Sequence, residues 1–172
     1  RQVLGGLAGL GVVGMGAGAV RYWLGRPANL ATHDYQLIAA PVDVELVTGH
    51  QTPAWGYGGQ APGLELRCRQ GERLRVRFIN QLPEPTTIHW HGIRLPLAMD
   101  GVPYVSQLPV LPGEYFDYDF ITPDAGSYWY HPHTSSSAQL GRGLVGPLII
   151  EEREASGFLE ERTLLLKTWA VD

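Results

Sequence analysis

The sequence predicts an all-β protein, namely an antiparallel β-sandwich or barrel of about eight or nine short strands. Apolar and polar residues alternate over several short stretches, which is the pattern of strands that bury one face. Turn-forming residues separate these stretches, because the chain of 172 residues contains 22 glycines and 13 prolines. Outside the apolar N-terminal tail, no segment shows a convincing helical pattern, so we expect strands and turns throughout.

The composition limits the possible classes of function. The length suits one ordinary domain plus a tail, and a hydrophobic content of 44% is enough for a core. The formal net charge of -4 provides no excess of Lys and Arg for binding phosphates, so we expect no nucleic-acid partner. The only cysteine, Cys68, excludes an internal disulfide and a cysteine-based zinc site. Any metal must therefore be bound by histidine and oxygen ligands.

The first twenty residues predict an export signal. Residues 3–20 are almost wholly apolar and uncharged but rich in glycine, which weakens a membrane-spanning helix. An arginine before Arg1 would complete a twin-arginine start, and the small residues 17–19 fit a cleavage site. We therefore expect residues 1–33 to be a truncated, twin-arginine-like export signal and linker, and the mature protein to be periplasmic or otherwise exported. An uncleaved membrane anchor is the alternative.

Strand patterns begin at Tyr35. We expect strands at 35–40 and 42–46, of which the second alternates strictly, and a Gly- and Pro-rich loop over 48–63. Two further half-buried strands are expected at 64–68 and 73–80, the latter ended by prolines.

The second half of the chain continues in the same way. Strands are expected at 87–92, 114–120, 127–133 and 143–150, and residues 163–166 have the pattern of one more strand. A long loop over 94–112 contains the dipeptide Asp-Gly at 100–101, a common turn signal.

Two of these strands carry His-x-His pairs, which are His89 with His91 and His131 with His133. Residues i and i+2 of a strand point to the same side and lie about 6.5 to 7 Å apart, a spacing that suits two imidazoles on one or two metal ions. If the two strands pair, four imidazoles share one face, and imidazole favours copper, zinc, iron and nickel. Pro132 cannot donate to a sheet ladder, so this strand end should lie at an edge where a metal could enter.

The other possible ligands are weaker candidates. His33 and His50 have no histidine nearby at ligand spacing, and Cys68 lies on an apolar strand face, where a small buried hydrophobe is expected rather than a copper thiolate. Three other His-x-His families fit poorly. A cupin needs a Glu shortly after His91, a metallo-β-lactamase needs an Asp at position 93, and a carbonic-anhydrase-like zinc site needs a third histidine.

One family fits both pairs. Residues 87–150, and more loosely the chain back to Tyr35, strongly resemble the first cupredoxin domain of multicopper oxidases, the laccase and copper-resistance oxidase group. The matching stretches are His89-Trp90-His91-Gly92, Asp100-Gly101, Pro112-Gly113, Trp129-Tyr130-His131-Pro132-His133 and Gly141-Arg142-Gly143-Leu144-Val145-Gly146-Pro147-Leu148.

The resemblance implies a cupredoxin-like Greek-key β-sandwich over residues 34–152. Residues 153–172 would then be a linker and the start of a truncated second domain. The family's His-x-x-His-x-His motif and His-Cys-His segment are absent from this chain. The type-1 copper site and the other ligands of the trinuclear cluster would therefore belong to missing C-terminal cupredoxin domains of the same protein.

The resemblance also implies roles for individual residues. The first histidine of the first pair binds the type-2 copper in this family, which assigns that role to His89. The remaining three, His91, His131 and His133, would bind the binuclear type-3 coppers. Asp100 stands where the family carries an acid that hydrogen-bonds toward the cluster and supplies protons, and a plain Asp-Gly turn is an equally open alternative.

The implied function is that of a multicopper oxidase, which couples one-electron oxidation of a phenolic, aromatic or metal-ion substrate to four-electron reduction of dioxygen to water. This chain would supply half of the trinuclear copper ligands and would be inactive alone. A non-catalytic periplasmic copper-binding cupredoxin-like protein is the alternative. A structural β-sandwich with incidental histidines is a third reading, which requires both pairs to arise by coincidence.

Overall fold

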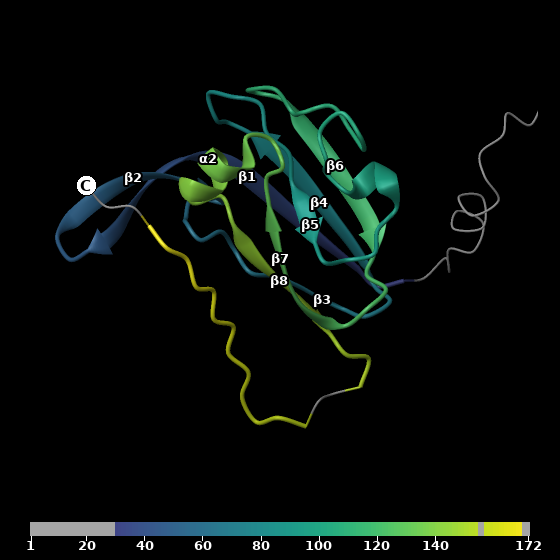
Figure 1. Ribbon diagram of the computed structural model, residues 1–172. Coiled ribbons are helices and arrows are strands. Elements are labelled where there is room, and N and C mark those ends of the chain that lie inside the picture. The colour runs from purple at the N-terminus through teal and green to yellow at the C-terminus, as the bar shows by residue number, and fades with distance from the viewer. Residues whose placement is uncertain (1–29, 155–156, 170–172) are drawn as a thin grey trace, which may run out of the picture.

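Two four-stranded sheets form the molecule in the computed structural model, which describes residues 30–154 and 157–169 (Figure 1). The first sheet has the order β2-β1-β4-β6. Its strands are β1 (Thr32–Val47), β2 (His50–Tyr57), β4 (Arg73–Asn80) and β6 (Tyr115–Ile121).

The second sheet has the order β3-β8-β7-β5 and carries both histidine pairs. Its strands are β3 (Leu66–Arg69), β8 (Gly146–Glu151), β7 (Gly126–His131) and β5 (His89–His91). Two short helices complete the fold, a 3-10 turn η1 (Leu97–Met99) before the Asp-Gly turn and a six-residue helix α2 (Ser136–Gly141) after the second pair. The mostly-β architecture predicted from the sequence is confirmed.

The structure corrects four details of that prediction. The sandwich is not wholly antiparallel, because β1 pairs with β4 and β3 with β8 in parallel, and alternation along a strand does not report its direction. The expected strands 35–40 and 42–46 are one strand, β1. Residues 48–63 are not a loop throughout, since they contain β2, an edge strand where a proline costs no sheet hydrogen bond. Residues 136–141 are helical.

The core lies between the sheets and is rich in aromatic rings. Along β4 the side chains of Leu74, Val76 and Phe78 point inward and are fully buried. From the opposite sheet, Trp90 packs against Tyr118 at 5.3 Å between ring centroids. Offset and edge contacts of this kind stabilise beyond simple burial, so Trp90 anchors the strand that carries His89 and His91.

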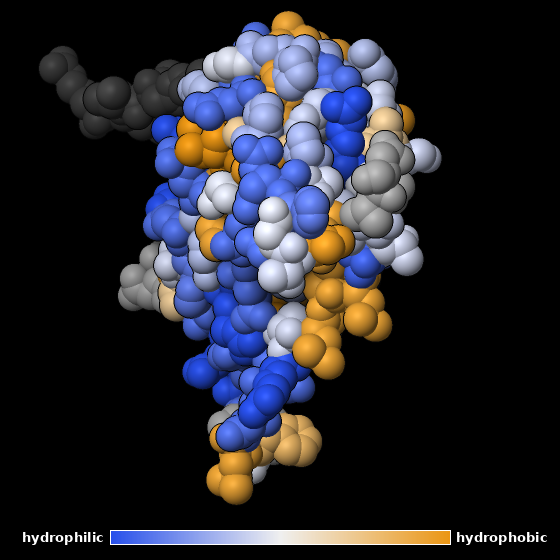
Figure 2. All heavy atoms as spheres, turned by 90° about the vertical axis from the view of Figure 1, so that its left-hand side faces the viewer, coloured by the Kyte–Doolittle hydropathy of each residue, from blue (hydrophilic) through white to orange (hydrophobic). Residues whose placement is uncertain are grey.

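The outer face of the first sheet is charged. The arginines of β4 alternate with its core residues, and each forms a two-pronged ion pair with an aspartate of β1 or β6. The pairs are Arg73 with Asp119, Arg75 with Asp34, and Arg77 with Asp117. On the face drawn in Figure 2, hydrophilic residues predominate, and hydrophobic ones form smaller patches at the top, along the sides and at the lower tip.

Parts of the sequence prediction fall at the ends of the chain. The proposed export signal over 3–20 lies outside the described residues. Within the part that the structure describes, no helix is long and apolar enough to span a membrane. Residues 163–166, expected to form a strand, have no regular structure and pair with none of the strands in the described part of the chain.

Candidate metal centre

The pairing of β5 with β7 places the two His-x-His motifs side by side. His89 lies opposite His131, Trp90 opposite Tyr130, and His91 opposite Trp129. Because side chains alternate across a strand, Trp90 and Tyr130 point into the core while the histidines point to the other side. A three-residue strand is therefore enough to set the histidines apart from the core.

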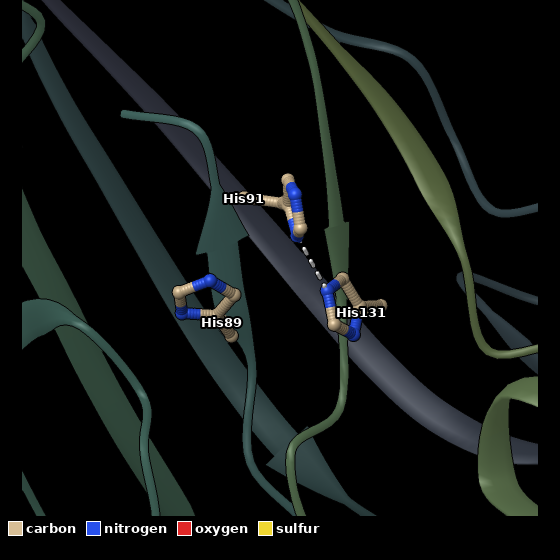
Figure 3. Close-up of side chains that lie close together, drawn as sticks. All are labelled: His89, His91 and His131. Carbon is tan, nitrogen blue, oxygen red and sulfur yellow. Dashed lines mark hydrogen bonds between the residues drawn. The ribbon is translucent and has the colours of Figure 1, made fainter. Parts of the chain in front are cut away.

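Three of the imidazoles converge. His91 Nδ1 lies 3.2 Å from His131 Nε2, and the dashed line in Figure 3 joins these two nitrogens. One nitrogen from each of His89, His91 and His131 lies within 4.8 Å of the others. A first-row metal bound at about 2.0–2.1 Å to two imidazole nitrogens leaves those nitrogens roughly 3 Å apart, which agrees with the His91–His131 separation.

The fourth histidine lies beyond the end of the β5–β7 ladder but against the same cluster. The ring of His133 is 4.3 Å from that of His89 and 5.2 Å from that of His131, measured between centroids. Its ligand atoms are not part of the tight group of three. The arrangement therefore offers three converging nitrogens and an adjacent fourth ring.

Backbone carbonyl groups fix which nitrogen of two rings is free. His89 Nδ1 lies 2.7 Å from the carbonyl oxygen of Asp100, and His131 Nδ1 lies 3.0 Å from that of Pro132. A carbonyl only accepts, so each Nδ1 carries the proton and each Nε2 keeps its lone pair. Such a contact to the second ring nitrogen is the usual partner of a metal-ligating histidine.

Asp100 is both the turn residue and a neighbour of the cluster. Its carboxylate oxygen Oδ1 lies 3.3 Å from His89 Nδ1, in addition to the contact through its carbonyl group. The following Gly101 has φ +73°, and a Cβ there would lie within bonding distance of the Ile88 carbonyl oxygen. Only glycine permits this close approach, which brings Asp100 against the histidine strand.

Trp129 supports two of the rings, a role that the sequence prediction missed. Its indole stacks on His131 at 4.1 Å and 22° between planes and lies 4.7 Å from His91. The signal was present in the sequence, because Trp129 is two residues before His131 and so shares its strand face. Stacking restricts the rotation of both imidazoles.

Burial keeps the second pair of histidines neutral. It lowers the pKa of His131 from 6.5 to about 4, and the neighbouring histidines act in the same direction. Burial and the positive charge that His89 can carry also lower the pKa of His133. Since metal ions bind the neutral form, these two rings are available as ligands at neutral pH.

The residues set aside from the sequence lie away from the cluster. His33 Nε2 lies 2.6 Å from a carboxylate oxygen of Glu72, and His50 is exposed at the start of β2. Cys68 is buried, its thiol contacts the Thr122 hydroxyl group, and burial raises its pKa to about 11. A thiol in that state is a small core side chain rather than a metal ligand.

Comparison with known proteins shows which family the chain resembles. The multicopper oxidase family profile matches residues 39–155. A copper resistance protein A homolog of Pseudomonas syringae pv. tomato is 38% identical over 85% of this chain and 25% of its own length. Copper resistance protein A of Escherichia coli is 38% identical over 72% of this chain and 20% of its own.

Solved structures similar to this chain are also multi-copper oxidases. A multi-copper oxidase from Pseudomonas thermotolerans is 78% identical with a TM-score of 0.82, over 84% of this chain and 35% of that one. One from Pseudomonas parafulva is 77% identical with a TM-score of 0.78, over 81% of this chain and 34% of that one. The chain thus spans only about a fifth to a third of the length of these proteins. From the extent of the profile match and these identities, the chain belongs to the multicopper oxidase family.

Proposed function

We propose that this chain is the N-terminal, copper-binding part of a multicopper oxidase and that its two His-x-His pairs supply half of a trinuclear copper site. The observation that carries the proposal is the 3.2 Å separation of His91 Nδ1 and His131 Nε2, with His89 and His133 against the same rings. Imidazole nitrogen is a good ligand for copper, and the described chain has no competing cysteine at the site.

Each histidine has a proposed role in that site. His89 would bind the type-2 copper through Nε2, because its Nδ1 donates to the Asp100 carbonyl group. His91, His131 and His133 would bind the type-3 coppers. Copper, when bound, supplies the one-electron redox steps that join oxidation of a reductant to reduction of dioxygen to water. Burial keeps His131 neutral at neutral pH by lowering its pKa, and the stacked Trp129 restricts its rotation.

Asp100 is proposed to hold and deliver protons near His89. Its carboxylate lies 3.3 Å from His89 Nδ1 and its side chain is 31% exposed, so it can exchange protons with water. Reduction of dioxygen to water consumes protons, and a carboxylate at hydrogen-bonding range of the ligands can relay them. Both readings of the Asp-Gly dipeptide, the turn and the functional acid, are compatible with this geometry.

The remaining features of the protein are part of the same proposal. The fold over 34–152 would be the first domain, a cupredoxin-like Greek-key β-sandwich, followed from 153 by a linker and a second domain. The partners would be dioxygen, a phenolic, aromatic or metal-ion reductant, and C-terminal cupredoxin domains of the same protein that carry the type-1 copper. The proposal also includes export to the periplasm, directed by a twin-arginine signal in the first residues.

A non-catalytic copper-binding protein is the second candidate. Within residues 30–154 and 157–169, Cys68 is the only cysteine. It is buried and its thiol contacts Thr122 rather than an imidazole, so this part of the chain offers no type-1 site. The two candidates differ in the sequence downstream of Asp172. A His-Cys-His segment there supports the oxidase, and a stop codon supports the binding protein.

The experiment that tests the proposal is a copper titration followed by oxygen-electrode measurements. The 172-residue chain should bind Cu²⁺ with a nitrogen-ligand spectrum and consume no oxygen with a phenol. The full-length protein should consume oxygen under the same conditions. Failure of the chain to bind Cu²⁺ would contradict the metal site, and oxygen consumption by the chain alone would contradict the division of the cluster between domains.

A further inference from the structure

The position of His133 needs an explanation that the β-sheet does not give. The β5–β7 ladder ends at the His89–His131 pair, and Pro132 has no N–H group to extend it. His133 nevertheless lies with its ring 4.3 Å from that of His89. Something other than strand pairing must hold the segment after Pro132 against the segment before His89.

Two sets of hydrogen bonds join these segments. The backbone N–H of His133 donates to the Thr87 hydroxyl oxygen at 3.3 Å. Six residues later, the side chain of Gln139 in α2 reaches back to residues 84–86. Both sets of hydrogen bonds therefore connect the segment before the first histidine pair, residues 84–87, with the segment that carries and follows His133.

Gln139 makes hydrogen bonds to three partners at once, of which Thr86 is fully buried. Its Nε2 donates to a Glu84 carboxylate oxygen at 2.8 Å and to the Pro85 carbonyl oxygen at 2.9 Å, and its Oε1 accepts from the Thr86 hydroxyl group at 2.7 Å. Glu84 and Pro85 offer only acceptors here, so the amide can be placed in one orientation alone. Gln139 is fully buried, so an unmade bond could not be replaced by bulk water.

We propose that Gln139 is a positioning residue of the copper site, which holds His133 beside His89 by fastening α2 to residues 84–86. The inference rests on the proposed copper function of the histidines. Helix α2 has only six residues and its N-cap, Ser135, makes no side-chain capping bond. The helix is too short to be stable alone, so the Gln139 contacts fix where it sits and hence where the chain from His133 enters it.

The test is a double-mutant cycle in Cu²⁺ affinity. Gln139→Met keeps the length of the side chain and removes all three hydrogen bonds. Gln139→Glu keeps the acceptor for Thr86 and removes the two donors. We expect either change to weaken Cu²⁺ binding by about tenfold, the lower end of the effect typical of outer partners of metal ligands. In a His133→Ala background the same changes should have no further effect, whereas in a His91→Ala background the tenfold loss should persist.

Asn80 is the matched control. It is also fully buried, and its amide makes three hydrogen bonds, two of them to the Glu84 and Val110 carbonyl groups, but none of the three reaches residues 133–139. Asn80→Leu should lower the melting temperature as Gln139→Met does. Its effect on Cu²⁺ affinity should be the same with and without His133.

A second readout needs no metal. Because the His133 amide donates to Thr87, its hydrogen exchange in the metal-free chain should accelerate in Gln139→Met and stay unchanged in Asn80→Leu. Unchanged Cu²⁺ affinity in Gln139→Met, or a loss of equal size in the His133→Ala background, would overturn the inference while leaving the copper site intact. Absence of Cu²⁺ binding by the unaltered chain would instead overturn the proposed function and the inference with it.

Discussion

His91 Nδ1 lies 3.2 Å from His131 Nε2 across the short β5–β7 ladder. The Nδ1 of His131 donates to the Pro132 carbonyl group, so its Nε2 presents a lone pair toward His91. Without a metal, His91 can donate a proton to that lone pair. With a metal, both nitrogens can bind the same ion, and the protein needs to move neither strand.

Removal of one of these ligands should abolish most of the affinity for copper. We expect His131→Ala to weaken Cu²⁺ binding by at least about 100-fold, more than loss of an outer partner would cause. His50→Ala is the matched control, because His50 is an exposed strand histidine outside the cluster. Isothermal titration of the three proteins measures the effect, and equal losses in both variants would argue against the proposed ligand set.

The stability of the metal-free protein should depend on pH through His131. Its pKa is lowered from 6.5 to about 4 by burial, so between these values the unfolded chain binds a proton that the folded chain does not. The free energy of unfolding should therefore be highest above pH 6.5 and fall by on the order of 3 kcal/mol as the pH decreases to about 4. Urea denaturation across this range measures it.

A variant separates His131 from other titrating groups. In His131→Leu the decrease in the free energy of unfolding over the same pH range should be smaller, although His133, whose pKa is also lowered, still contributes in the same direction. The paired aspartates, such as Asp34 and Asp117, have lowered pKa values, so their contribution to stability is lost mainly below about pH 4. An unchanged pH dependence in His131→Leu would show that other groups cause it.

The turn at Gly101 should be more sensitive to substitution than another glycine of similar backbone conformation. A Cβ at Gly101 collides with the Ile88 carbonyl group, whereas a Cβ at Gly113, with φ +84°, meets nothing within 4 Å. Gly113→Ala should cost about 1–2 kcal/mol of stability from backbone strain alone. Gly101→Ala should cost more and also weaken Cu²⁺ binding, because it displaces Asp100 from His89. Thermal melts and copper titrations of both variants test this.

The stacked indole should restrict the imidazoles that it covers. Trp129→Ala removes the contacts with His131 and His91. One aromatic contact is worth about 0.5–1.5 kcal/mol, so loss of the stacking that orders His131 should lower Cu²⁺ affinity by roughly 2- to 12-fold. Trp129→Phe keeps an aromatic face and should retain most of the affinity. If both variants bind Cu²⁺ as tightly as the unaltered chain, the indole has no role in ordering the rings.

The sequence predicted those features that depend on local pattern. Alternation located β4 and β6, and the i, i+2 spacing placed His89 and His91 on one face of β5. The expected strand over 127–133 ends at His131, so His133 lies beyond β7. The sequence pattern could not reveal β2, because glycines and prolines in an edge strand resemble those of a loop. Nor could it reveal the parallel pairing of β1 with β4, which depends on how the chain crosses between sheets.

Contacts between residues distant in the chain could not be predicted. Gln139 lies in a small polar segment with no helical or catalytic pattern, and its importance appears only when its amide is seen among residues 84–86. Similarly, the contact of His89 with the Asp100 carbonyl group depends on a turn that folds back on β5. Side-chain spacing predicts which face a residue occupies, whereas its partners depend on the tertiary fold.

The most direct test is a crystal structure of the chain soaked with Cu²⁺, located by anomalous scattering. We expect one copper ion to be bound by both His91 Nδ1 and His131 Nε2 at about 2 Å from each, with His89 and His133 turned toward the same site. Copper bound elsewhere, for example at His33 and Glu72, with His91 and His131 still in direct hydrogen-bond contact, would contradict the account.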